Sequence, residues 1–218
     1  MKKELIIFIT LLTVINIFCW DRYSNDSEMW FQESINFQSI IHYSFYVSTS
    51  QTVTLETTNT SGDTYMYLWS ETDCKQIAKD DDSGEGACSK IITSLSPGTY
   101  IVFIRSYSSN AASTCNLLKN GQTVLTNAKY SGYKYNVSQF NEETRFKAQP
   151  DYGDTYCLLV NTNGDLIGYN DDSNSSLGSQ IIASEKPLYF ILGSYSPTIE
   201  GTARFSFTED MNKEYLAM

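Results

Sequence analysis

Apolar and polar residues alternate in short runs along most of this chain. Tyr43–Val47, Thr52–Thr57 and Thr64–Trp69 each alternate in this way, and comparable runs continue to Ala203–Phe207. A period of two residues places successive side chains on opposite faces of a β-strand. Runs of this length, separated by Gly, Asn, Asp and Ser, are typical of antiparallel strands. No stretch keeps a helical period with capping residues, so the sequence predicts an all-β protein.

Short motifs recur in the same order in the second half of the chain. Gly62-Asp63-Thr64-Tyr65 returns as Gly153-Asp154-Thr155-Tyr156, and such self-similarity is the signature of repeated structural units. Each copy has about ninety residues, the size of a β-sandwich domain. We interpret the short polar stretch Asn120–Gly132 as the junction. The prediction is two tandem antiparallel β-sandwich (jelly-roll-like) domains, with an N-terminal segment at 21–35, repeat one at 36–127, repeat two at 128–210 and a C-terminal tail at 211–218.

The first residues have the pattern of a secretory signal peptide. Lys2 and Lys3 precede an apolar run from Leu5 to Phe18, which is short for a membrane span. We predict a signal peptide at 1–20 and a secreted or cell-surface protein, with an uncleaved signal anchor as the alternative. No later apolar run is long enough to cross a membrane, so we expect no membrane insertion after cleavage.

Charge and composition narrow the classes of function. The net charge of −10 disfavours nucleic acid and anionic lipid as partners, and it suits cations, basic partners or simple solubility. His42 is the only histidine, so a serine or cysteine triad has a single candidate base. The chain carries no Gly-x-Ser-x-Gly elbow, no His-Glu-x-x-His motif and no phosphate-binding loop. We therefore expect no enzyme, and a carboxylate pair in a small secreted hydrolase is the remaining catalytic alternative.

Secretion favours disulfide bonds. Cys19 leaves with the signal peptide, and the remaining Cys74, Cys88, Cys115 and Cys157 can pair in three ways. Cys74 and Cys88 flank an acidic loop, so we predict that they staple it and that Cys115 and Cys157 join the two halves. The alternative for Cys157, which lies in an apolar stretch, is a small buried hydrophobic residue.

Asn-x-Ser/Thr sequons provide four candidate glycosylation sites. They are Asn25, Asn59, Asn136 and Asn174. In a eukaryotic secretory pathway these asparagines would be surface acceptors, so we expect their side chains to be exposed.

Acidic residues cluster in equivalent loops of the two copies. They are Asp63, Asp80, Asp81 and Asp82 in copy one, and Asp154, Asp171 and Asp172 in copy two. Calcium binds several hard oxygens, which clustered carboxylates and backbone carbonyls supply. One calcium ion per copy is therefore one interpretation. The other is turn chemistry, because Asp before Ser or Gly commonly bonds its own backbone.

An aromatic row alternates with an aliphatic row on one predicted strand. Tyr65, Tyr67 and Trp69 face one way, and Met66 and Leu68 face the other. An exposed aromatic row would form a stacking platform for sugar rings or a protein partner. The same row is largely aliphatic in copy two, which favours a buried core instead.

The order of motifs resembles a known family. The residues that carry it in copy one are Gly62-Asp63, Leu68, Ile77-Ala78, Asp80–Gly84, Ser89, Ile91, Leu95, Pro97-Gly98-Thr99-Tyr100 and Val102. This order resembles the bacterial pre-peptidase C-terminal domain and, more distantly, the collagen-binding domains of secreted collagenases. Copy two departs from it at Lys186-Pro187, where Pro-Gly-Thr-Tyr is lost. The resemblance implies a non-catalytic β-sandwich, some relatives of which bind calcium or matrix polymers.

These observations together predict a secreted, non-catalytic binding or adhesion module. It would engage an extracellular protein or polysaccharide, with calcium as the candidate cofactor of its acidic loops. The alternatives are a structural surface or matrix protein without a small ligand, and a small secreted hydrolase.

Overall fold

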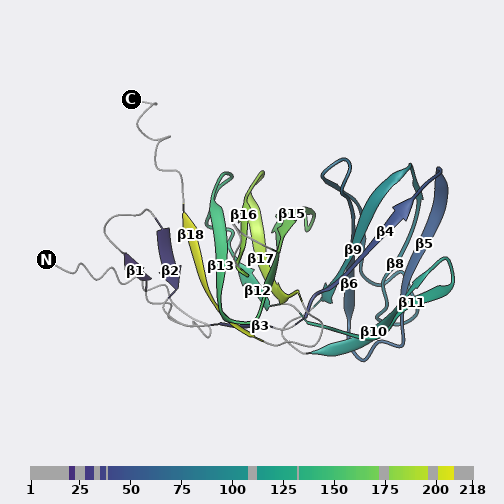
Figure 1. Cartoon of the computed structure of the whole chain (residues 1–218), viewed down its shortest axis with the longest axis horizontal. Coiled ribbons are helices and arrows are strands. Elements are labelled where there is room, and N and C mark those ends of the chain that lie inside the picture. The colour runs from purple at the N-terminus through teal and green to yellow at the C-terminus, as the bar shows by residue number, and fades with distance from the viewer. Residues whose placement is uncertain are drawn as a thin grey trace, which may run out of the picture.

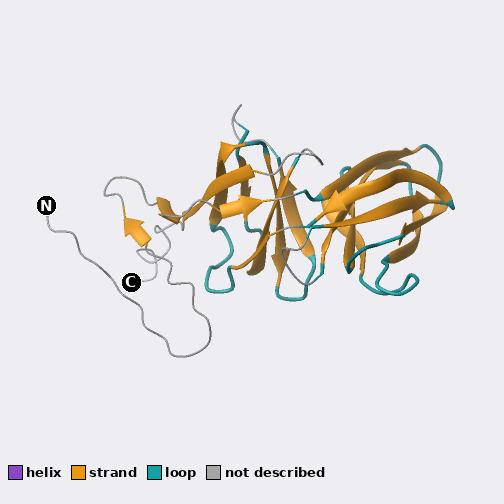
Figure 2. Cartoon of the chain, turned by 90° about the horizontal axis from the view of Figure 1, so that it is seen from below, coloured by secondary structure: helices purple, strands orange, loops and turns teal. Residues whose placement is uncertain are grey.

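The structure is a computed structural model that describes residues 20–22, 28–31, 35–37, 39–107, 112–131, 133–171, 177–195 and 201–208. Within these residues the protein is all-β, with antiparallel strands and no helix (Figure 2), which confirms the predicted fold class. This part of the chain accordingly has no helix that is long and apolar enough to span a membrane. Residues 1–19 of the predicted signal peptide and the predicted tail at 211–218 lie outside the described residues.

Repeat one forms a sandwich of two four-stranded sheets. Its strands are β4 (Ile41–Val47), β5 (Gln51–Thr58), β6 (Thr64–Ser70), β7 (Lys75–Asp80), β8 (Lys90–Leu95), β9 (Gly98–Ser106), β10 (Ser113–Lys119) and β11 (Gln122–Tyr130). The outer sheet has the order β11-β10-β5-β8, and the inner sheet has the order β4-β9-β6-β7. Met66 and Leu68 of the inner sheet pack with Leu55 and Leu117 of the outer sheet, so alternation directs one face of each sheet inward.

Repeat two has the same topology. Its strands are β12 (Tyr133–Asn136), β13 (Arg145–Tyr152), β14 (Thr155–Asn161), β15 (Leu166–Asn170), β16 (Ser179–Ile182), β17 (Pro187–Ser194) and β18 (Gly201–Thr208). The inner order β12-β17-β14-β15 matches β4-β9-β6-β7, and the outer order β18-β13-β16 matches β10-β5-β8. Phe146, Phe190 and Phe205 form the centre of its core. The sequence repeat is therefore a repeat of structure.

The two outer sheets are completed by different parts of the chain. In repeat one, β11 lies beside β10 and is joined to it by Asn120-Gly121, whose φ angles of 51° and 77° make a tight hairpin turn. In repeat two, β18 pairs instead with β2 (Glu28–Phe31) and β3 (Ile35–Phe37), and β2 pairs in turn with β1 (Trp20–Arg22).

Two predictions about domain boundaries are corrected by this arrangement. The boundary at 127/128 falls inside β11, because the stretch interpreted as a junction is the second strand of a hairpin. The N-terminal segment predicted at 21–35 is not separate either, because its strands belong to the outer sheet of repeat two.

The two inner sheets face each other, so the sheets form four layers (Figure 1). Buried apolar side chains form three cores, one inside each sandwich and one between the two inner sheets. Tyr67, Trp69 and Phe103 from the first sandwich meet Tyr156 and Leu158 from the second. The aromatic row on β6 is thus buried, as its aliphatic counterpart in copy two suggested, and the alternative of an exposed stacking platform there is wrong. The core that buries this aromatic row lies between the two sandwiches rather than inside one of them.

Candidate functional site

The acidic site of the first sandwich forms where β6 begins and β7 ends. Because these strands are antiparallel neighbours, with Met66 opposite Asp80, Asp63 just before β6 comes next to Asp81 and Asp82 just after β7. One carboxylate oxygen from each of Asp63, Asp81 and Asp82 lies within 4.8 Å of the other two. The structure therefore brings together three of the predicted calcium ligands of copy one.

Two of these carboxylates have an oxygen that is shielded from water without a partner. Oδ1 of Asp63 and Oδ1 of Asp81 are buried and accept no hydrogen bond from the described residues. Burial first, and then the charges of Asp82 and Asp63, raise the pKa of Asp81 to about 6. Burial and Asp82 raise the pKa of Asp63 as well. A negative cluster of this kind is disfavoured without a cation, since buried charges need neutralisation.

Arg105 is the nearby cation, but its donors are directed elsewhere. Its Nε and Nη2 donate to Tyr67 Oη at 3.2 and 3.0 Å, and its Nη1 donates to the carbonyls of Ser106 and Tyr107 at 2.7 and 3.4 Å. Its charge still lowers the pKa values of Asp63 and Asp81, although burial outweighs this effect. The guanidinium therefore moderates the acidic cluster without occupying it.

Asp80 does not belong to this cluster, which corrects its assignment as a metal ligand. Its carboxylate accepts hydrogen bonds from Ser83 N, Ser83 Oγ and Lys90 N at 3.1, 2.6 and 2.7 Å. The equivalent Asn170 accepts one from Gln180 N at 3.1 Å with a neutral amide oxygen. Turn chemistry, the second interpretation of the acidic loops, therefore explains Asp80.

The second sandwich has the same framework around its acidic loop. The main-chain oxygens of Asp63 and Asp154 each accept a hydrogen bond at 3.1 Å, from Tyr107 N and Tyr195 N. Burial lowers the pKa of His42 and raises that of Tyr156, and the nearby charge of Asp171 has the smaller effect of raising the pKa of both groups. Asp172 lies outside the described residues, and among the described ones the trio of copy one is the group with three such ligand atoms together.

Aromatic pairs flank both acidic loops, and the sequence analysis missed them. Tyr65 stacks with Tyr107 at 6.1 Å, and the equivalent Tyr156 stacks with Tyr195 at 6.2 Å. Both outer rings are partly exposed, 46% at Tyr107 and 43% at Tyr195. Tyr107 and Tyr195 each lie in a repeated Ser-Tyr-Ser motif, which was the signal in the sequence that could have revealed these pairs.

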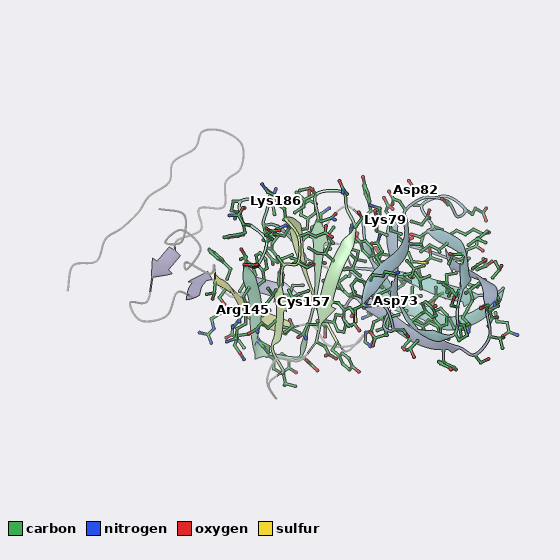
Figure 3. The ribbon with its side chains drawn as sticks, turned by 90° about the horizontal axis from the view of Figure 1, so that it is seen from above. Asp73, Lys79, Asp82, Arg145, Cys157 and Lys186 are labelled. Atoms are coloured by element: carbon green, nitrogen blue, oxygen red, sulfur yellow. The ribbon has the colours of Figure 1, made fainter. Side chains whose placement is uncertain are left out.

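Neither predicted disulfide is present, because all four described cysteines are free. Cys74 precedes β7, whose six residues span about 20 Å, and Lys90, near Cys88, bonds Asp80 at the far end of that strand. In Figure 3, Asp82 lies at one edge of the first sandwich, and Asp73, at the other end of β7, lies well apart from it. Disulfide-bonded Cα atoms lie within about 7 Å, so Cys74 cannot reach Cys88.

The second pairing fails for a different reason. Cys115 lies in the core of the first sandwich and Cys157 in the core of the second, with both inner sheets between them. Cys157 is fully buried, in agreement with the alternative of a small hydrophobic residue.

Two of the four sequon asparagines can be placed. Asn59 and Asn136 are exposed, as a glycan acceptor requires. Asn25 and Asn174 lie outside the described residues.

Comparison with known proteins does not assign this chain to a family. No protein-family model matches the chain, and no curated protein matches it. The chain is similar to the crystal structure of a DUF861-family protein of unknown function from Pseudomonas syringae pv. tomato str. DC3000. The identity is 9%, the match covers 87% of this chain and 86% of the other, and the TM-score is 0.20. A TM-score this low carries no argument, so the resemblance to pre-peptidase C-terminal domains stays a prediction.

Proposed function

We propose that this chain is a non-catalytic extracellular binding module whose first sandwich is stabilised by a calcium ion at Asp63, Asp81 and Asp82. The observation that carries the calcium proposal is the pair of buried, unpartnered oxygens on Asp63 and Asp81. A carboxylate oxygen in this state costs free energy unless a cation takes the place of water.

Distances within the cluster suit calcium. Calcium holds oxygens at 2.3–2.6 Å, so two ligands on opposite sides of the ion are about 4.6–5.2 Å apart. The three carboxylate oxygens lie within 4.8 Å of one another, which lets one calcium ion contact all three. Magnesium needs a stricter octahedron with shorter bonds of about 2.0–2.1 Å, which carboxylates on irregular loops meet less readily.

Two observations support a binding role: the packing of the histidine and the scaffold of two sandwiches that carries loops at its rims. His42 packs against two aromatic rings, Tyr156 with centroids 5.3 Å apart and Tyr195 at 4.8 Å, so it has a packing role. A rigid four-layer scaffold that carries loops at its rims is suited to presenting a binding surface. A secreted or cell-surface protein would meet enough calcium to fill such a site, because extracellular calcium-binding modules have Kd values of about 0.1–1 mM.

Thermal unfolding with calcium and with a chelator tests the proposal. A ligand that binds only the folded state at a hundred times its Kd adds about 2.7 kcal/mol, which for a chain of this size raises Tm by about 5–10 °C. Asp63→Asn and Asp81→Asn should each abolish this rise, and the exposed Glu142→Gln should keep it. A Tm that is the same in calcium and in chelator would exclude the calcium role.

A further inference from the structure

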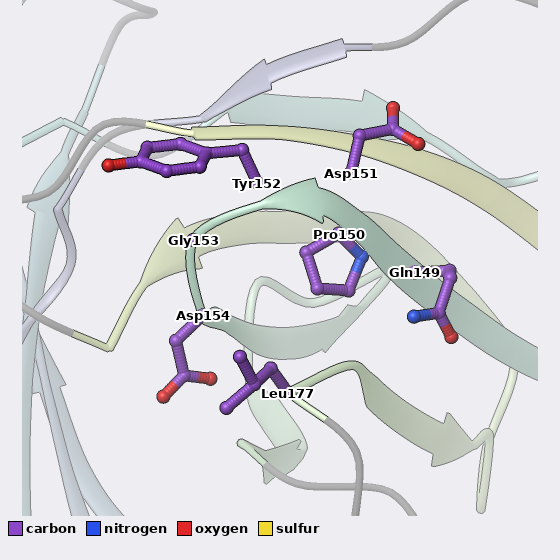
Figure 4. A pocket seen from close by; sticks show the side chains of 7 residues that line it. All are labelled: Gln149, Pro150, Asp151, Tyr152, Gly153, Asp154 and Leu177. Carbon is purple, nitrogen blue, oxygen red and sulfur yellow. The ribbon is translucent and has the colours of Figure 1, made fainter.

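An open hollow of about 540 Å³ lies at the end of β13 in the second sandwich (Figure 4). Its lining includes Pro150, Tyr152 and Leu177 as apolar groups, together with Gln149, Asp151 and Asp154. The volume is within the range of roughly 300–1,000 Å³ that small-ligand sites occupy. Tyr152 is 70% exposed and Leu177 57%, and Figure 4 shows the Tyr152 ring directed outward from the turn, at the rim of the hollow.

Strand pairing explains why the chain is open here. β13 pairs with β16 only from Arg145 to Ala148, and Pro150 has no N–H with which to continue a ladder. On the other edge, the register against β18 shifts between Pro150 and Tyr152, which leaves Asp151 as a bulged residue. Bulges redirect side chains and are common beside functional sites.

The first sandwich shows that the fold does not need this hollow. Its equivalent corner, at Thr60 to Gly62, is closed by polar contacts: Thr60 Oγ1 bonds Tyr130 Oη at 2.6 Å, and Ser61 N donates to Thr114 O at 2.9 Å. Ser61 and Ala87 stand where the second sandwich has Tyr152 and Leu177. The large exposed side chains are therefore particular to copy two.

We propose that this hollow binds a neutral sugar unit of an extracellular glycan. The exposed Tyr152 ring and Pro150 suit the apolar C–H face of a pyranose, as aromatic rings do at many recognition surfaces. The carboxylate of Asp154 can accept hydrogen bonds from sugar hydroxyl groups, and the amide of Gln149 can both accept and donate them. Asp151 and Asp154 repel anionic ligands, and a basic peptide is less suited because Asp151 already pairs with Arg204 at 3.3 Å.

The test measures binding of neutral oligosaccharides to the full chain. Cellopentaose, laminaripentaose, mannopentaose and chitopentaose are titrated separately at up to about 10 mM, by saturation-transfer NMR and calorimetry, in calcium and in chelator. At least one should bind under both conditions, since the hollow does not include the acidic cluster of the first sandwich. Tyr152→Ala should weaken this binding at least about tenfold, whereas Tyr152→Phe should stay within about twofold.

Tyr46→Ala is the matched control, because Tyr46 is 68% exposed on the other sandwich and should leave sugar binding unchanged. The proposal is overturned if no oligosaccharide binds, or if Tyr152→Ala binds as well as the unmodified chain. Sugar binding that is lost in chelator and in Asp81→Asn but kept in Tyr152→Ala would move the ligand to the acidic cluster. That result would leave the proposed calcium role standing.

Discussion

The two sandwiches can be compared position by position because they share one topology, and each serves as an internal control for the other. In both, a buried threonine at the start of the central strand bonds a buried serine: Thr64 with Ser89, and Thr155 with Ser179. In both, the residue before that threonine accepts a hydrogen bond from Tyr107 N or Tyr195 N. Features that recur at the same geometry are the requirements of the fold.

The copies differ at the corner beside the acidic loop, and this difference marks the hollow of the second sandwich. The first sandwich gathers Asp63, Asp81 and Asp82, and closes its neighbouring corner with Tyr130. The second leaves that corner open and places Tyr152 at its rim. Asp80 and its neutral counterpart Asn170 accept the same kind of backbone hydrogen bond in the two copies, so the turn explains Asp80 without a ligand.

The largest effect is expected from breaking the core that the two sandwiches share. Phe103 is fully buried and contacts Tyr156 and Tyr169 with ring centroids 5.7 and 4.9 Å apart. Phe103→Ala should cost about 3–5 kcal/mol in urea unfolding, and Ile191→Ala, from the other side, about 2–5 kcal/mol. Both variants should unfold in one transition. Two separate transitions, with Phe103→Ala affecting only the first, would show that the shared core does not couple the sandwiches.

A sharper comparison comes from the paired threonines. Ser179 N donates to Thr155 Oγ1 at 2.9 Å, whereas Ser89 N has two acceptors, Thr57 Oγ1 at 2.8 Å and Thr64 Oγ1 at 2.9 Å. Leaving a buried donor without an acceptor costs about 1–3 kcal/mol. Thr155→Val should therefore destabilise the chain more than Thr64→Val, as measured by chemical denaturation. Equal losses would show that the spare acceptor Thr57 does not contribute.

A smaller effect is expected from pH. The pKa of Asp81 is raised from 3.8 to about 6, so the folded state binds more protons than the unfolded state between these values. In chelator, stability should accordingly fall as the pH rises through this window. Calcium needs the ionised carboxylate, so its affinity should rise over the same window, by at most about tenfold between pH 5 and 7.

His42 provides the control for this pH dependence. Burial lowers its pKa below 6.5, so its contribution has the opposite sign: stability is present above pH 6.5 and is lost as the pH falls below it. Asp81→Asn should remove the first dependence and keep the second, and His42→Gln should do the reverse. If Asp81→Asn left the dependence of stability on pH unchanged, the raised pKa of Asp81 would not be its cause.

The smallest effect is expected at Asp80. Because Asn170 fills the same role with an amide, Asp80→Asn should change stability by no more than about 0.5 kcal/mol and leave calcium binding intact. Asp80→Ala should cost about 1 kcal/mol through the lost backbone hydrogen bonds. Calcium binding abolished by Asp80→Asn would return Asp80 to the metal site.

Much of the fold could be predicted from the sequence because half-buried strands keep their alternation and the repeat confirms each strand twice. The shared core was missed for the opposite reason. Met66 and Leu68 are buried on one face of β6 while Tyr67 and Trp69 are buried on the other, so the strand has no polar face to reveal its orientation. The uninterrupted apolar run in β6 was the available signal.

Other features leave little local trace. The pairing of β18 with β2 and β3 joins opposite ends of the chain, and no periodicity predicts which distant strands meet. In the acidic loop, residue type alone cannot separate Asp81, which holds an unpartnered oxygen, from Asp80, which bonds the backbone. The one available signal in the sequence was Asn170, which shows that the position of Asp80 does not require a charge.

Direct calorimetric titration of the full chain with calcium tests the central claim. We predict saturable binding with a Kd of about 0.1–1 mM that is lost in both Asp63→Asn and Asp81→Asn and kept in Asp80→Asn and Glu142→Gln. No binding at about 10 mM calcium, or binding that survives both Asp63→Asn and Asp81→Asn, would contradict the account.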